Sequence, residues 1–315
     1  MTIDSETSHK ISRLQWICCL LVVLQHSVPN VNESIVCNIV AGCLTRVAVP
    51  FFFVLSGLLY FKSFSPSIAF AWNQVFKRTR TLLIPYAFFN LVGIMVGIVG
   101  GDGAQNLIVQ GGAKLLRGDG IPGLSGHLWY IGMLFKIVVI GLPLGLFIER
   151  VGIGIPIIFL IAYFGGLLPI YSSSLFFFSL GGVWSLGFDK HYENRVHKRK
   201  FLFCAILLSI GAIVATLLFP KQFNHSLFVI IYSIAAMNCL WFAYDLIEKS
   251  NVWPVIDKVA PASFFVYCVH PYFYIASIHY FIVRAILMLI GSLIVYVVMK
   301  KCAPRVLAII SGGRG

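Results

Sequence analysis

Long runs of apolar residues alternate with short polar joints along almost the whole chain. A membrane-spanning helix needs roughly 20 mostly apolar residues, and ten blocks near that length follow one another. They cover residues 14–30, 39–61, 81–100, 127–148, 152–170, 173–188, 201–219, 226–247, 259–278 and 285–300. The pattern predicts an all-α fold, a polytopic membrane helix bundle of about ten transmembrane helices in a single domain over residues 1–315.

The composition excludes a water-soluble enzyme. Of the 315 residues, 59% are hydrophobic and 11% are charged, and the mean hydropathy is +0.91. Soluble domains average about 25% charged residues, so this chain lacks the polar side chains that would cover a soluble surface. We therefore expect an integral membrane protein.

Positive charge predicts the orientation, because Lys and Arg are retained on the cytoplasmic side of a membrane. With a cytoplasmic N-terminus, 18 of the 24 Lys and Arg residues fall on the inside and 2 lie within spans. The 4 that fall in outer loops are Lys114, Arg117, Lys221 and Arg284. Both termini are thus predicted to be cytoplasmic, as a segment over 1–13 and a tail over 301–315. The net charge of +13 follows from this topology and requires no nucleic-acid partner.

Polar groups at membrane depth are expensive and usually face a cavity or a partner. All 11 Asp and Glu fall in loops or at span ends, which argues against a proton-coupled transporter. The basic groups that remain inside are His26, Arg46, Lys136, His270 and, at the start of the fourth span, His127. The topology places all of these except Lys136 in the outer half of the bilayer. Their convergence predicts a functional site, the alternative being a set of structural residues, and Lys136 is given no role.

The eight cysteines show neither a Cys-x-x-C pair nor a His at zinc-ligand spacing. We therefore predict no metal site. Ser56 and Gly57 are interpreted as a close-packing or kink element, not as a nucleophile, because small residues let helices approach.

Six segments carry more specific motifs. They are residues 17–27 (ICCLLVVLQHS), 46–57 (RVAVPFFFVLSG), 78–86 (RTRTLLIPY), 127–130 (HLWY), 177–181 (FFSLG) and 263–271 (SFFVYCVHP). In this order they resemble the signatures of the acyltransferase-3 family of integral membrane O-acyltransferases, and the second segment is the most specific. The similarity extends over nearly the whole chain.

The resemblance implies transfer of an acyl group, usually acetyl from cytoplasmic acetyl-CoA, to a hydroxyl of a cell-surface glycan or lipid-linked saccharide. Such an enzyme would lie in a bacterial inner membrane. Its partners would be acyl-CoA, the glycan acceptor and membrane lipid, with acyl-CoA as a substrate and no permanently bound cofactor.

On this interpretation His26 is the general base, because a neutral imidazole can take the proton of an attacking hydroxyl. Arg46 would stabilise the oxyanion of the tetrahedral intermediate, the alternative being a tie between helices. Since no carboxylate lies within the spans, Gln25, Ser27 or a backbone carbonyl is expected to orient His26. The acceptor side is predicted to contain His127, Trp129, Tyr267 and His270. For Trp129 the alternative is an interfacial aromatic belt.

Cations at the cytoplasmic side are candidates for the phosphates of the donor, since Arg binds phosphate through paired hydrogen bonds. They are Lys77, Arg78, Arg80 and Arg13. The alternative is simple retention of positive charge on the inside. Two positions depart from the family pattern, since Gln15 and Thr81 stand where an Arg is common. Arg13 either replaces the Arg missing at Gln15 or that role is lost.

Two other classes of function remain open from the sequence. A polar path through a helix bundle also suits an exporter or flippase of a surface polysaccharide or its precursor. The chain could also be an assembly subunit of a polysaccharide machine. His26→Ala discriminates, because an acyltransferase should lose its activity whereas a transporter should tolerate the change. For an assembly subunit, loss of both His26 and Arg46 should have no effect.

Overall fold

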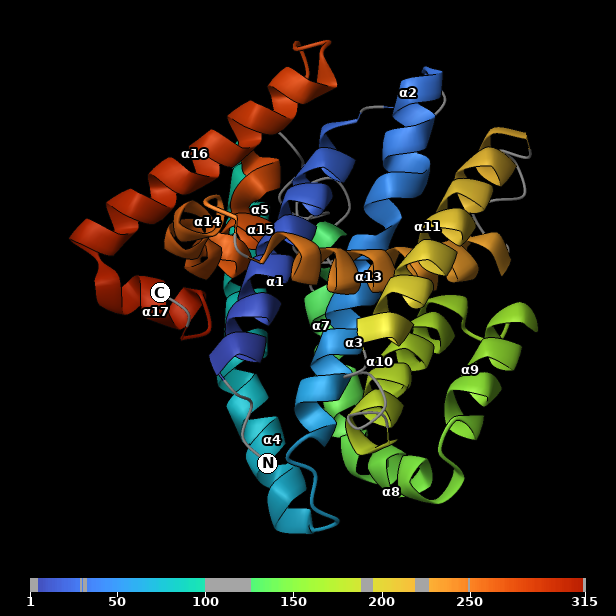
Figure 1. Cartoon of the computed structure of the whole chain (residues 1–315). Coiled ribbons are helices and arrows are strands. Elements are labelled where there is room, and N and C mark those ends of the chain that lie inside the picture. The colour runs from blue at the N-terminus through green and yellow to red at the C-terminus, as the bar shows by residue number, and fades with distance from the viewer. Residues whose placement is uncertain are drawn as a thin grey trace.

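The computed structural model describes residues 5–28, 30, 33–99, 126–187, 195–218, 227–248 and 250–313. Within these residues every regular element is a helix, as predicted. Figure 1 shows the helices gathered around α1 and α3, with α16 on one side and α8 and α9 on the other. The core is apolar and runs from α1 and α3 through α7 and α10 to α15.

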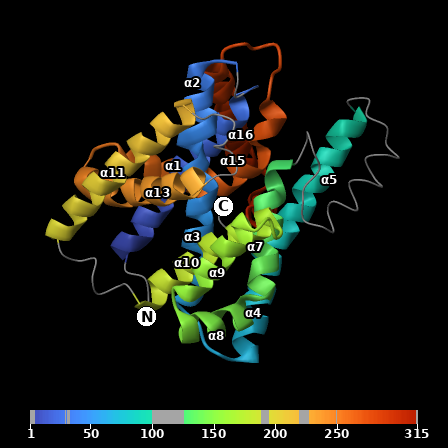
Figure 2. The ribbon, with the colours of Figure 1, turned by 90° about the vertical axis from the view of Figure 1, so that its right-hand side faces the viewer.

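The N-terminal part contains two long helices that are interrupted by irregular turns. Its elements are α1 (Ser5–Ser27), α2 (Ile35–Cys37), α3 (Ala48–Phe61), α4 (Ile68–Arg78) and α5 (Ile84–Val99). A π-helical turn (Asn38–Cys43) and a 3-10 turn (Leu44–Val47) join α2 to α3, and a π-helical turn (Thr79–Leu83) joins α4 to α5. Pro50 and Pro85 follow these turns, and proline cannot donate to the carbonyl four residues earlier. Figure 2 shows α4 and α5 following one another as a long rod.

The rest of the chain contains helices that range from 7 residues in α14 to 24 residues in α11. They are α7 (Trp129–Val139), α8 (Gly141–Val151), α9 (Gly154–Phe164), α10 (Pro169–Gly187), α11 (Arg195–Leu218), α13 (Leu227–Ile247), α14 (Trp253–Val259), α15 (Ser263–Val269), α16 (Phe281–Cys302) and α17 (Pro304–Ile310). A 3-10 turn, Gly126–Leu128, precedes α7. The helices α11 and α13 pack against each other, and α16 packs against α1 (Figure 1).

Four described helices are long and apolar enough to cross a membrane. They are Ile35–Phe61, Ile68–Val99, Phe228–Ile247 and Phe281–Cys302. The pair Gly126–Val139 and Gly141–Val151, bent by 69°, would add a fifth if it forms one span. The chain is thus a helical protein with several membrane-spanning helices, but the prediction of about ten spans is not confirmed by the described residues.

One predicted span, residues 259–278, does not form a continuous helix. A 3-10 turn (Ala260–Ala262), the short α15, and a second 3-10 turn (His270–Phe273) replace it, and the chain then runs without helix to Tyr280. Pro261 and Pro271 lack the N–H that a helix interior requires. His270 therefore lies in a turn and not along a transmembrane helix.

Helices α3 and α10 approach each other through glycines. A Cβ on Gly57 would lie 2.0 Å from the carbonyl oxygen of Phe178, and one on Gly181 would lie 2.0 Å from that of Val54. Both glycines belong to motifs singled out in the sequence, and the two motifs therefore pack against each other. The interpretation of Gly57 as a close-packing residue is confirmed.

Candidate active site

Three histidines from separate segments meet at one place. His26 lies in the last turn of α1, His127 in the turn before α7, and His270 in the turn after α15. The ring centroids of His127 and His270 are 5.1 Å apart, those of His26 and His270 5.2 Å, and those of His26 and His127 6.1 Å. The structure thus brings together the three histidines that the sequence placed at a common depth.

Backbone carbonyls hold the two deeper histidines. His270 is fully buried, and its Nδ1 donates to the carbonyl oxygen of Tyr267 at 2.9 Å. Its Nε2 is then the acceptor nitrogen, and within the described residues it has no hydrogen-bond partner. His127 donates from Nε2 to the carbonyl oxygen of Cys268 at 3.0 Å, and its own carbonyl accepts from the Tyr267 hydroxyl. Both rings are therefore fixed in orientation by the segment around α15.

His26 differs from these two residues because its side chain is exposed to a cavity of about 390 Å³, here called the His26 cavity. The other polar residues that line it are Gln25, Thr45, Arg46, Tyr163, Ser173, Ser174 and Ser233. Among the described residues His26 makes ring contacts with His127 and His270 but no side-chain hydrogen bond. The His26 side chain can thus meet a molecule in the cavity.

The expected orienting groups of His26 are engaged elsewhere. Gln25 accepts a hydrogen bond from the Thr45 hydroxyl, and Ser27 donates to the carbonyl oxygen of Leu24 at 2.8 Å. The prediction that Gln25, Ser27 or a backbone carbonyl orients His26 is therefore wrong for the described residues. The ring contacts of His26 are with His127 and His270.

Arg46 reaches the His26 cavity from an irregular part of its helix. It lies in the 3-10 turn Leu44–Val47, and Pro50 is four residues further along. The bond between Thr45 and Gln25 ties this turn to the end of α1. The turn and the tie together place a guanidinium in the cavity that His26 faces.

The predicted acceptor residues do not share one cavity, and Tyr267 lines a different one from Trp129. Trp129 lines the His26 cavity, whereas His127 and His270 are buried behind His26 and do not line it. Sequence reasoning missed Tyr163 and the serines of α10, although the run of three serines at residues 172–174 is a polar signal beside an apolar block.

A second cavity of about 90 Å³, here called the Arg78 cavity, lies closer to the start of α1. Gln15 lines it together with Arg78, Tyr130 and Tyr267. The ring centroid of Tyr267 is 5.8 Å from that of His127 and 6.0 Å from that of Tyr130. The rings of Tyr267, His127 and His26 therefore form a continuous aromatic connection between the two cavities.

The four cations predicted to bind the donor occupy different surroundings. Arg78 lines the Arg78 cavity, whereas Lys77 and Arg80 are exposed, with Arg80 stacked 4.5 Å over the ring of Phe76. Arg13 lies one residue before the first predicted span, and its guanidinium is paired with Asp257 of α14 at 2.7 Å.

The pair of Arg13 and Asp257 joins α1 to the segment around α14. Arg13 donates to both carboxylate oxygens of Asp257, at 2.7 and 2.8 Å, and to the hydroxyl of Tyr244 at 2.6 Å. These hydrogen bonds and the positive charge of Arg13 lower the pKa of the Asp257 carboxyl. Gln15, and not Arg13, lines the Arg78 cavity.

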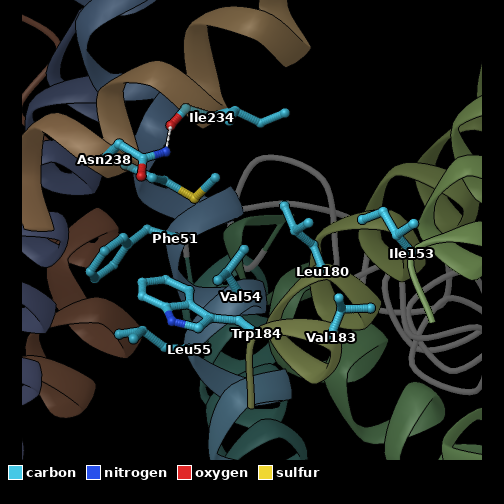
Figure 3. A pocket seen from close by; sticks show the side chains of 10 residues that line it. Phe51, Val54, Leu55, Ile153, Leu180, Val183, Trp184, Ile234 and Asn238 are labelled. Atoms are coloured by element: carbon cyan, nitrogen blue, oxygen red, sulfur yellow. Dashed lines mark hydrogen bonds between the residues drawn. The ribbon is translucent and has the colours of Figure 1, made fainter. Parts of the chain in front are cut away.

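A third cavity, of about 190 Å³, is almost entirely apolar. Figure 3 shows it between Phe51 and Val54 of α3, Trp184 of α10 and Asn238 of α13. The amide of Asn238 donates to the carbonyl oxygen of Ile234 at 2.8 Å. No titratable side chain lines this cavity. In the described part of the chain no His, Cys, Asp or Glu cluster is arranged to hold a metal ion.

Comparison with known proteins identifies the family. The sequence model of the acyltransferase-3 family, described as an acyltransferase domain, matches residues 9–299. No curated protein and no solved structure matches the chain. The matched region includes all residues of the His26 and Arg78 cavities. The chain therefore belongs to the acyltransferase-3 family and is an integral membrane acyltransferase.

Proposed function

We propose that this acyltransferase moves an acetyl group from cytoplasmic acetyl-CoA to a hydroxyl of a cell-surface glycan or lipid-linked saccharide. The observation that carries the proposal is the contrast between His26 and its two neighbours. His127 and His270 use their N–H groups on backbone carbonyls, whereas His26 faces a cavity that also contains Arg46. A base and a cation in one accessible cavity are what hydroxyl attack on a thioester requires.

The reaction follows from these two side chains. His26 takes the proton of the acceptor hydroxyl while the hydroxyl oxygen forms a bond to the thioester carbonyl carbon. The carbonyl oxygen becomes an oxyanion, and Arg46 stabilises it through charge-assisted hydrogen bonds. When the intermediate collapses, the carbon–sulfur bond breaks and the thiolate of CoA takes the proton from His26. The products are the acetyl ester and free CoA, with His26 neutral again.

The donor and the acceptor would approach through different cavities. Arg78 is the cation inside the Arg78 cavity, and we assign to it a phosphate of acetyl-CoA, with Lys77 and Arg80 at the surface beside it. Trp129 and Tyr163 line the His26 cavity, where an aromatic face and a hydroxyl suit a sugar ring. Both termini would then lie in the cytoplasm, and the His26 cavity would open toward the outer side of a bacterial inner membrane.

Mass analysis of the surface glycans tests the proposal. Cells that contain the gene should carry acetyl esters on their glycans, and cells without it should lack them. Complementation with His26→Gln should leave the glycans unmodified, because Gln keeps the volume and hydrogen bonding of the side chain but cannot take up the proton at neutral pH. Glycans that are the same with and without the gene would refute the proposed function.

A further inference from the structure

Arg284 is a buried cation outside the cavities described above. The sequence pattern predicted it in an outer loop, but it lies near the start of α16 and is 2% exposed. Its Nη1 donates to the carbonyl oxygen of Ser27 at 2.7 Å, and its Nη2 donates to that of Ile278. The guanidinium also lies 4.5 Å over the ring of Tyr274.

The positive charge of Arg284 lies at the end of α16 where it lowers the stability of that helix. The N-terminal end of a helix carries partial positive charge, so a cation there is unfavourable, whereas the C-terminal end favours a cation. Arg284 lies in the first turns of α16, but its guanidinium reaches the C-terminal end of α1, where Ser27 is the last residue. The positive charge of Arg284 therefore stabilises the C-terminal end of α1.

The contact with Ser27 acts on the turn that carries His26. The last four carbonyls of a helix have no partner within the helix. In α1 the Ser27 hydroxyl donates to the carbonyl oxygen of Leu24, and the Arg284 guanidinium donates to the carbonyl oxygen of Ser27. This fixes the last turn of α1 at the residue next to His26.

The same guanidinium also holds the segment that follows His270. Tyr274 and Ile278 lie in the non-helical stretch between the His270–Phe273 turn and α16, and Arg284 contacts both. One buried side chain thus joins the segment ends that present His26 and His270, whose rings are 5.2 Å apart.

We propose that Arg284 is a positioning residue for His26. The inference rests on the proposed function, in which His26 is the base. Arg284 does not line the His26 cavity, so it acts on the reaction through the last turn of α1. Loss of its contacts should displace His26, and a displacement of about 1 Å can lower a rate by about 10²-fold.

Two measurements on the purified full chain test this proposal. The first is hydrogen exchange of backbone amides in Arg284→Gln. We expect faster exchange in peptides from residues 20–28 and unchanged exchange in peptides from residues 5–16. Ser292→Ala is the matched control, because Ser292 is also fully buried in α16 but donates within its own helix to Met288. Unchanged exchange at residues 20–28, or an equal increase everywhere, would overturn the positioning role.

The second measurement is the release of CoA from acetyl-CoA in the presence of glycan isolated from cells that lack the gene. Arg284→Gln should lower kcat about 10- to 100-fold and leave the KM for acetyl-CoA unchanged. Arg284→Lys should recover part of kcat, since an ammonium still donates to the Ser27 carbonyl. In a His26→Gln background, Arg284→Gln should cause no further loss.

The outcomes separate the two proposals. Undiminished kcat in Arg284→Gln, or an added loss in the His26→Gln background, contradicts the positioning role while the proposed function stands. A wild-type protein that transfers no acetyl group refutes the proposed function, and the exchange measurement then decides whether Arg284 holds the last turn of α1.

Discussion

Replacing Gly181 by Ala is expected to destabilise the protein and to disturb the His26 cavity at the same time. The new Cβ would lie 2.0 Å from the carbonyl oxygen of Val54 and 2.8 Å from the backbone nitrogen of Leu58. Cβ contacts below 3.0 Å essentially never occur, so α3 and α10 must separate by about 1 Å in a closely packed interior. Overpacking of this kind costs about 1–3 kcal/mol.

The separation of α3 and α10 would also change the His26 cavity. Phe53 of α3 and Phe177 of α10 both line the His26 cavity, and a misplacement of about 1 Å can lower the rate of acyl transfer by about 10²-fold. Thermal unfolding of the purified chain in detergent measures the first effect, and acetyl transfer to isolated glycan measures the second. Both should fall in Gly181→Ala.

Gly211→Ala is the matched control. Gly211 lies within α11, and a Cβ there meets nothing within 4 Å. Since Ala is favoured over Gly in a helix by about 1 kcal/mol, this variant should be as stable as the wild type or more stable. If Gly181→Ala is as stable and as active as Gly211→Ala, then α3 and α10 do not approach each other as described.

Three further predictions concern the site and its support. His26→Gln should lower kcat by a factor of about 10² to 10⁴ at normal protein abundance, and a wild-type rate in this variant would exclude His26 as the base. Arg46→Lys keeps the charge but loses the planar fork, so it should retain partial activity. Arg78→Gln should raise the KM for acetyl-CoA by about 10- to 100-fold, since a charge-assisted hydrogen bond is worth about 1.5–3 kcal/mol. Arg80→Gln is the exposed control and should have a smaller effect. An unchanged KM in Arg78→Gln would show that Arg78 does not bind acetyl-CoA. Because the pKa of Asp257 is lowered in the folded protein, its ionised form stabilises the fold above its ordinary pKa of about 3.9, and this stabilisation is lost as the pH falls through the lowered value. The melting temperature of Asp257→Asn should thus lie below that of the wild type at pH 7, with a difference that closes below about pH 4; a difference independent of pH would refute this.

The sequence was sufficient to predict a helical membrane protein and the convergence of the three histidines. The apolar block around His26 forms the helix α1, whereas the block that begins at His127 is divided into α7 and α8, which are bent by 69°. The topology also placed Arg46, early in the inward-going second span, at the same depth as His26, and both side chains line the His26 cavity. These features follow from the order and orientation of the apolar blocks along the chain, which is why they could be predicted.

The position of Arg284 could not be predicted in the same way. A charged residue beside an apolar block marks a loop boundary on hydropathy alone, and the pattern therefore predicts a span that begins at residue 285. The structure extends the helix to include Arg284, because the carbonyls of Ser27 and Ile278 accept its hydrogen bonds. A partner 257 residues away in the sequence leaves no local signal.

The prediction of a continuous helix over residues 259–278 is wrong for a different reason. Its mean hydropathy is that of a membrane helix, but Pro261 and Pro271 interrupt the helix and leave the seven-residue α15 between them. This break has a consequence for the site, since it allows the carbonyls of Tyr267 and Cys268 to accept hydrogen bonds from His270 and His127. Hydropathy reports burial in lipid, but it does not report which carbonyls a broken helix leaves free.

Acetyl transfer by the purified chain in lipid vesicles tests the central claim most directly. Radiolabelled acetyl-CoA would be supplied on the side of the Arg78 cavity and unmodified surface glycan on the side of the His26 cavity. We predict that the label appears on the glycan as an alkali-labile ester with wild-type protein, and that it stays on acetyl-CoA with His26→Gln. Glycan that crosses the vesicle membrane without taking up label, or labelling that is equal for both proteins, would contradict the account.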